Sequence, residues 1–168
     1  MQVLAAFIKK IKPKLTPLNV AQFLCVAGLL VFIIVTLSSG CTRDITISDI
    51  KQNVSGFENI NELNESEPSE ILKIFGTSFE NCVYYKASDI MDVRELLIIK
   101  TSSDEEMEAA EKAIDLRLNT QLDNFEGYGA EQVFLLNQSI CEKCGQYIFY
   151  AVGYEAQSWR SSFLKLIK

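Results

Sequence analysis

The fold is decided by residues 95–125, whose sequence is ELLIIKTSSDEEMEAAEKAIDLRLNTQLDNF. The four consecutive apolar residues from Leu96 to Ile99 are typical of a strand that is covered on both faces. We therefore expect residues 95–100 to form a strand at the centre of a sheet.

A long amphipathic helix is predicted directly after this strand. Ser103 is a favourable N-cap, and Glu106, three positions later, completes a capping box. Apolar residues then recur at steps of three and four over about six turns: Met107, Ala110, Ile114, Leu118, Leu122 and Phe125. The acidic residues at the start of the helix favour its positive end. Capping and solvation account for them, and no calcium site is predicted.

Shorter elements are predicted on both sides of this unit. Two further strands rich in aromatic and β-branched residues are expected at Val83–Tyr85 and Tyr147–Val152. Four helices are also expected. Two precede the long helix: one passes through Ile47, Ile50 and Val54 with its N-cap at Ser48, and one runs from Ser69 to Gly76 with Ile71, Leu72, Ile74 and Phe75 on its apolar face. Two follow it: one covers 130–138 with Val133, Phe134 and Leu136 buried, and the last presents Trp159, Phe163 and Ile167. The predicted fold class is α+β, with a small sheet of about three strands packed by amphipathic helices.

A basic and then apolar segment precedes this domain. Its lysines, at positions 9, 10, 12 and 14, are followed by an apolar run from Val20 to Leu37 and by the small residues 38–40 directly before Cys41. This order is typical of an export signal, and its end resembles a lipobox, in which Cys41 would be lipidated and become the N-terminus. The run of about eighteen residues also suits an uncleaved membrane anchor. Under both alternatives residues 1–41 serve as signal or anchor, and residues 42–168 face the outside of the cell membrane.

Charge and composition exclude several functions. From Cys41 onward, 22 acidic residues outnumber 12 basic ones, which gives a net charge of −10. Nucleic-acid binding needs clustered basic residues and is not predicted. The sequence has no histidine, the commonest general base and metal ligand. We therefore predict no catalytic constellation, metal or cofactor.

The Cys141-x-x-Cys144 motif is the one pattern that suggests chemistry. A structural disulfide, a pair of inert thiols and a redox pair are all compatible with it. A redox pair usually places its first cysteine at a helix N-terminus, whereas these residues lie in a predicted turn before a strand. Tetrahedral zinc needs two more ligands, and only Cys82 remains in the domain.

Three residues near the end of the long helix are candidates for a ligand pocket. They are Arg117, Gln121 and Tyr128. The alternative is that Arg117 forms a surface ion pair and that Tyr128 covers Phe125 in the core.

The sequence resembles a family of small Firmicute lipoproteins known as the domain of unknown function 4358. The resemblance rests on the strand Leu96–Ile99, the acidic capped helix with Arg117 and Gln121, the aromatic residues Phe125 and Tyr128, and the strand at 147–152 after Gly145. It covers most of the chain from residue 47 to residue 164. It implies an exported, lipid-anchored protein with no established activity.

Two functional hypotheses follow. The first is a non-enzymatic binding or accessory module that is tethered to the membrane and whose partner is an envelope protein or a small extracellular ligand. The alternative is an extracytoplasmic thiol-disulfide protein that acts through Cys141 and Cys144.

Overall fold

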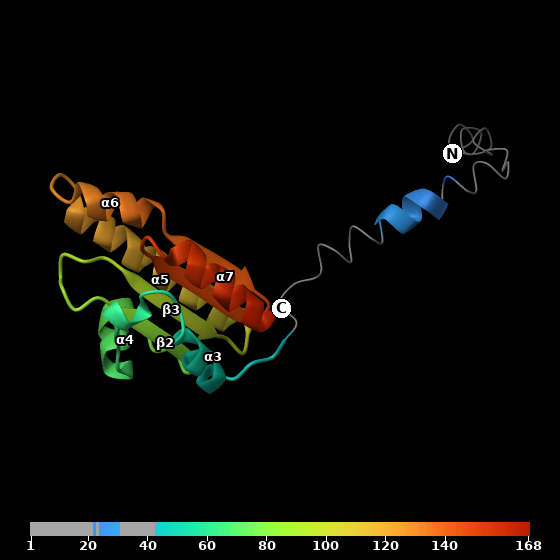
Figure 1. Cartoon of the computed structure of the whole chain (residues 1–168), viewed down its shortest axis with the longest axis horizontal. Helices are drawn as coiled ribbons and strands as arrows, with labels where there is room; N and C mark the ends of the chain where they lie inside the picture. Colours follow the sequence, from blue (N-terminus) through green and yellow to red (C-terminus); the bar gives the residue numbers. More distant parts are fainter. Residues whose placement is uncertain (1–21, 23, 31–42) are drawn as a thin grey trace, which may run out of the picture. The chain divides into compact units, whose positions relative to one another are not determined.

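The structure is a computed structural model that describes residues 22, 24–30 and 43–168 (Figure 1). The chain divides into two units, Met1–Ser39 and Gly40–Lys168. Cys41 and most of the predicted signal or anchor lie outside the described residues. Among the residues that are described, no helix is long and apolar enough to cross a membrane. The fold described below is that of residues 43–168.

The centre of the fold is a five-stranded antiparallel sheet with the strand order β1-β2-β3-β5-β4. The strands are β1 (Asn64–Glu65), β2 (Cys82–Lys86), β3 (Glu95–Lys100), β4 (Ile140–Cys144) and β5 (Tyr147–Val152). The three predicted strands are confirmed as β2, β3 and β5, and β3 is central. The sheet has five strands rather than about three, because β1 forms where no strand was predicted and β4 replaces the predicted turn around Cys141.

All the predicted helices are present. They are α3 (Ile47–Val54), α4 (Pro68–Phe75), α5 (Asp104–Phe125), α6 (Ala130–Asn137) and α7 (Ala156–Ile167), with a short 3-10 helix η1 (Ile60–Glu62). Ser103 caps α5 as predicted, since its hydroxyl accepts from the Glu106 amide at 3.2 Å. The N-cap of α3 is Thr46 rather than Ser48, because the Thr46 hydroxyl accepts from the Asp49 amide.

Helices cover both faces of the sheet, and each face has its own core (Figure 1). Leu96 and Ile98 pack with α3 and α7, whereas Leu97 and Ile99 pack with α4, α5 and α6. This alternation explains why the whole apolar run of β3 is buried. Two predicted core positions are wrong: Leu72 and Phe134 lie on the outer sides of α4 and α6 and are 48% and 54% exposed.

The two ends of the sheet differ in what they contact. At the C-terminal end of β3, the Lys100 ammonium pairs with Asp44 at 2.6 Å, and the Tyr147 hydroxyl bonds the backbone of Ile45. The first described residues of the domain are therefore fixed at this end. The loop 87–94 lies at the other end, where β3 begins.

Truncation of a central β3 side chain should strongly destabilise the domain. Ile98 is fully buried, so Ile98→Ala should lower the free energy of unfolding by about 2–5 kcal/mol, from lost burial and a residual cavity. The matched control is Ile90→Ala in the loop 87–94, where the side chain is 89% exposed and a change within about 0.5 kcal/mol is expected. Urea unfolding of the full chain in non-ionic detergent measures both, and equal losses would contradict the central position of β3.

Candidate functional site

A buried carboxylate begins the central strand. Glu95 is the first residue of β3 and only 1% exposed. Strand alternation directs it to the same face as Leu97 and Ile99, toward α5. Burial of an unpaired carboxylate is strongly unfavourable, so this position requires hydrogen-bond donors around it.

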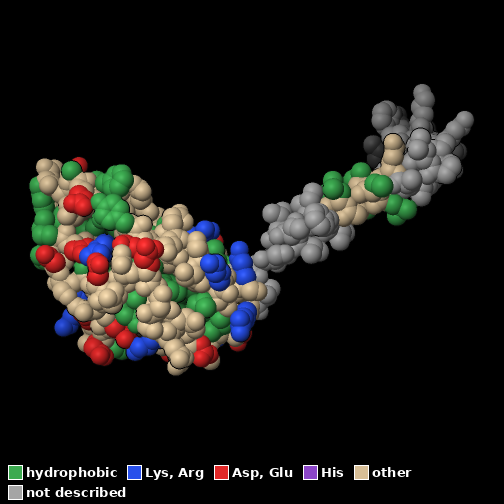
Figure 2. All heavy atoms as spheres, viewed as in Figure 1, with side chains coloured by type: hydrophobic (Ala, Val, Ile, Leu, Met, Phe, Trp, Pro, Cys, Tyr) green, Lys and Arg blue, Asp and Glu red, His purple; other side chains and the backbone are tan. Residues whose placement is uncertain are grey.

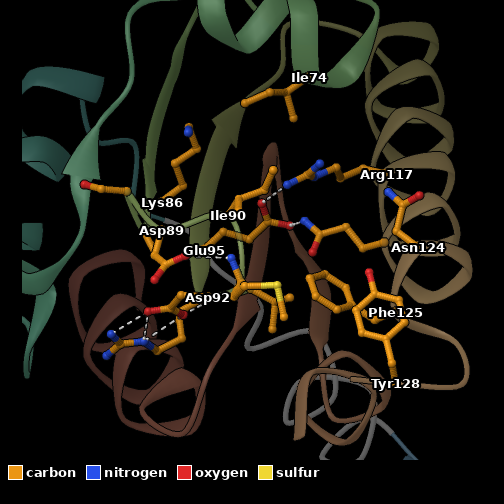
Figure 3. Close-up of a pocket in the computed structure, with 16 residues that line it drawn as sticks. Ile74, Lys86, Asp89, Ile90, Asp92, Glu95, Arg117, Asn124, Phe125 and Tyr128 are labelled. Carbon is orange, nitrogen blue, oxygen red and sulfur yellow. Dashed lines mark hydrogen bonds and ion pairs between the residues drawn. The ribbon is translucent and has the colours of Figure 1, made fainter. Parts of the chain in front are cut away.

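Four side chains supply these donors (Figure 3). Tyr84 and Arg117 donate to one carboxylate oxygen, Oε2, at 2.5 and 3.2 Å. Tyr150 and Gln121 donate to the other oxygen, Oε1, at 2.8 and 3.3 Å. The donors come from β2, β5 and α5, so the carboxylate joins three elements that are distant in sequence.

The backbone places these donors without distortion. Tyr84 on β2 and Tyr150 on β5 both pair with Leu97, so the two rings flank β3 on the face that carries Glu95. Arg117 and Gln121 are four residues apart and therefore share one face of α5. In its other orientation, the Gln121 amide accepts from Arg117 Nε at 2.9 Å instead of donating to Glu95.

The network fixes the protonation states of its donors. Burial and the neighbouring Glu95 charge raise the pKa of Tyr84 and of Tyr150 far above the usual range, so both hydroxyls stay protonated and donate. Burial opposes the charge of Arg117, but the neighbouring Glu95 carboxylate outweighs it and raises the pKa of the guanidinium. Glu95 therefore has a permanent cation beside it.

A cavity of about 630 Å³ opens beside this network (Figure 3). Cavities of this size are typical of small-molecule sites. The loop 87–94 and the last turns of α5 form its walls. The lining residues are Ile74, Lys86, Ala87, Ser88, Asp89, Ile90, Met91, Asp92, Val93, Arg94, Glu95, Arg117, Gln121, Asn124, Phe125 and Tyr128.

The loop wall is held in place by its own bonds. Both carboxylate oxygens of Asp92 accept hydrogen bonds from the Arg94 guanidinium. Glu62 of η1 accepts from Nη1 of the same group at 2.6 Å. The side chain of Arg94 is therefore fully engaged. Gln132 of α6 donates to the Met91 carbonyl at 3.0 Å, which ties the loop to the helix layer.

The opposite wall is aromatic. The Tyr128 ring lies against Phe125, with 5.8 Å between ring centroids. Gly129 permits this arrangement, because a Cβ at that position would lie 2.7 Å from the Phe125 ring. A larger residue there would displace the ring from the cavity wall.

The three predicted pocket residues lie together in this lining. Arg117 and Gln121 are at its inner end, while Tyr128 is at the surface and 68% exposed. The ion pair of Arg117 is formed with buried Glu95 rather than with a surface acid. Sequence reasoning missed Glu95, Tyr84 and Tyr150. A glutamate that opens an otherwise apolar central strand was the available signal.

Of the alternatives for the Cys141-x-x-Cys144 motif, a disulfide between the two residues is not formed, since Cys141 is a free cysteine. Both residues lie on β4, where positions three apart are about 10 Å apart and face opposite sides of the sheet. A disulfide needs Cα atoms within about 7 Å. Burial, followed by the charges of Asp115 and Glu111, raises the pKa of Cys141 to about 11, which makes its thiol a weak nucleophile at neutral pH.

The thiol of Cys82 is a weak nucleophile at neutral pH for the same reason. Burial raises the pKa of Cys82 to about 11. Within the described part of the chain, no three potential ligands among histidine, cysteine, aspartate and glutamate lie close enough to hold a metal ion.

Residues 53–153 match the family described as "Domain of unknown function (DUF4358)". The match spans the strands β1 to β5 and every residue of the Glu95 network. No curated protein and no solved structure matches the chain.

Removal of the buried carboxylate should destabilise the domain far more than removal of a surface one. Glu95→Ala leaves the Arg117 charge and two tyrosine hydroxyls without their acceptor, so we expect a loss of about 3–5 kcal/mol. Glu142→Ala is the control, because Glu142 pairs with Arg160 on the surface and such pairs contribute at most about 1 kcal/mol. Urea denaturation of both variants tests this, and similar losses would show that the network is not structurally important.

Proposed function

We propose a binding function for this chain, which belongs to the family of the domain of unknown function DUF4358. In this proposal the protein is a membrane-anchored, extracytoplasmic module that holds a small polar ligand in the cavity beside Glu95. One observation carries the proposal. Glu95 engages Arg117 through Nη2 at 3.2 Å, and the Arg117 side chain keeps 24% of its surface exposed at the cavity. The guanidinium is thus held rigidly with polar N–H groups available at a cavity of ligand size.

The chemistry of the cavity supports binding rather than catalysis. Glu95 already accepts hydrogen bonds from Tyr84, Arg117 and Tyr150, so few of its lone pairs are available to a ligand. Tyr84 and Tyr150 are held protonated by their raised pKa. The thiols of Cys82 and Cys141 lie outside the lining, and the sequence has no histidine. What remains are groups that orient a ligand.

The position of the cavity within the domain suits a tethered receptor. The chain reaches the domain beside Lys100, at the last residue of β3, whereas Glu95 is the first. The six residues of β3 span about 17 Å. The cavity is therefore at the end of the sheet remote from the N-terminal junction, where an extracellular ligand or an envelope protein would have access.

The geometry of β4 does not support a thiol-disulfide function that acts through a Cys141–Cys144 pair. The two cysteines of the motif face opposite sides of β4, and the raised pKa of Cys141 opposes thiolate formation.

A substitution that fills the cavity should abolish ligand-induced stabilisation. Asn124 lines the cavity from the exposed side of α5, so Asn124→Trp should block the space without disturbing the core. Asn119→Trp is the matched control on the same helix, at an exposed position outside the lining. The full chain in non-ionic detergent is screened by thermal unfolding against a library of polar small molecules.

We expect at least one compound to raise the Tm of the wild type and of Asn119→Trp, but not of Asn124→Trp. At a hundred times its Kd, such a ligand stabilises by about 2.7 kcal/mol, which corresponds to a shift on the order of 10 °C. The absence of any compound with this pattern would refute the proposed binding function.

The proposed anchor has a separate test. Intact-mass measurement of the membrane form should give a chain that starts at Cys41 and carries two acyl chains, because a single chain anchors only marginally. Cys41→Ser should retain residues 1–40 and lack the lipid mass. If the wild-type chain instead retains residues 1–40 and is unmodified, lipidation is refuted and the segment is an uncleaved anchor.

A further inference from the structure

The inner end of the cavity provides a site for a carboxylate. The side chain of Arg117 is 24% exposed and lines the cavity, while its Nη2 is held by Glu95. A guanidinium that is already fixed by Glu95 loses little entropy when it binds a planar anion. Lys86 adds a second cation to the lining, paired with Glu70 at 3.0 Å.

The loop wall of the cavity provides a site for a cation (Figure 3). Three carboxylates line the cavity: Asp92 is engaged by Arg94, and Glu95 by Arg117. Asp89 has no ion pair among residues 43–168. Its Oδ1 accepts from the Met91 amide at 2.9 Å, which orients the carboxylate and leaves its other oxygen available to an ammonium group.

Apolar side chains surround the mouth of the cavity. Ile90, Met91 and Tyr128 line it although they are 89%, 45% and 68% exposed. Figure 2 shows apolar side chains gathered over the end of the domain that carries α6 and the loop between β2 and β3. These residues would contact an apolar group of a ligand whose charged groups are held further in.

We infer that the ligand is a zwitterionic amino compound with an apolar side group, of the size of a free amino acid or a dipeptide. Its carboxylate binds Arg117, and its ammonium group binds Asp89. The net charge of −10 in the domain repels a free anion at long range, whereas a zwitterion escapes this repulsion and still uses the guanidinium. A purely cationic ligand would make no use of the Arg117 guanidinium. The inference rests on the proposed binding function.

Four probes separate the contributions of the two charges. The full chain in non-ionic detergent is titrated calorimetrically with leucine, leucyl-leucine, N-acetyl-leucine and leucinamide. N-acetyl-leucine lacks the ammonium group, and leucinamide lacks the carboxylate. We expect leucine or leucyl-leucine to bind about tenfold or more tightly than both modified forms, since each loses one charge-assisted contact.

Two variants assign the charges to residues. Arg117→Gln should remove the preference for leucine over leucinamide, and Asp89→Asn should remove the preference for leucine over N-acetyl-leucine. Asp89 is exposed on the loop, so its variant should fold even if Arg117→Gln does not. The matched control is Asp123→Asn, an exposed acid of α5 outside this cavity, which should preserve both preferences.

The outcomes distinguish the inference from the function on which it rests. Equal affinities for leucine and its two modified forms, or no binding of any of the four probes, would overturn the zwitterion assignment. If a library compound still stabilises the wild type but not Asn124→Trp, the binding function stands with another ligand class. If no compound does so, both are wrong.

Discussion

The buried carboxylate of Glu95 is the interaction on which the cavity end of the domain depends. A carboxylate that is 1% exposed is tolerated because hydroxyl, guanidinium and amide groups from β2, β5 and α5 surround it. Since these elements must reach their positions before the charge is satisfied, the network ties the formation of the sheet to the docking of α5. Apolar packing alone could accommodate α5 in neighbouring registers. The Glu95 carboxylate receives its hydrogen bonds from α5 in only one of these registers.

The same network shapes the cavity. Arg117 is held on its inner side by Glu95, so the guanidinium cannot extend to solvent as a surface arginine would. The loop 87–94 begins where β2 ends and closes beside Glu95, and its fold is fixed by Arg94 and Asp92. A structural ion pair in the core and a polar site at the surface therefore share one side chain. This sharing connects the stability of the domain to its proposed function.

The Cys141-x-x-Cys144 motif illustrates how secondary structure decides chemistry. In a turn, two cysteines at this spacing can converge on one point. In β4 the same spacing separates them and turns them toward opposite faces. The pairing of β4 with β5 is thus the reason that the one recognisable motif of the sequence carries no supported chemistry.

The sequence by itself determined the helices, the three central strands and the α+β class, because periodicity and capping are local properties that Leu96–Ile99 and Ser103 display without any partner. It also placed Arg117, Gln121 and Tyr128 near one helix end. Only the tertiary structure decided what these residues do. Tyr84 and Tyr150 lie 66 positions apart and meet at Glu95 through strand pairing, and no local pattern encodes which strands become neighbours. The short strands β1 and β4 also depend on tertiary structure, since each is a strand only because its neighbour supplies the hydrogen bonds.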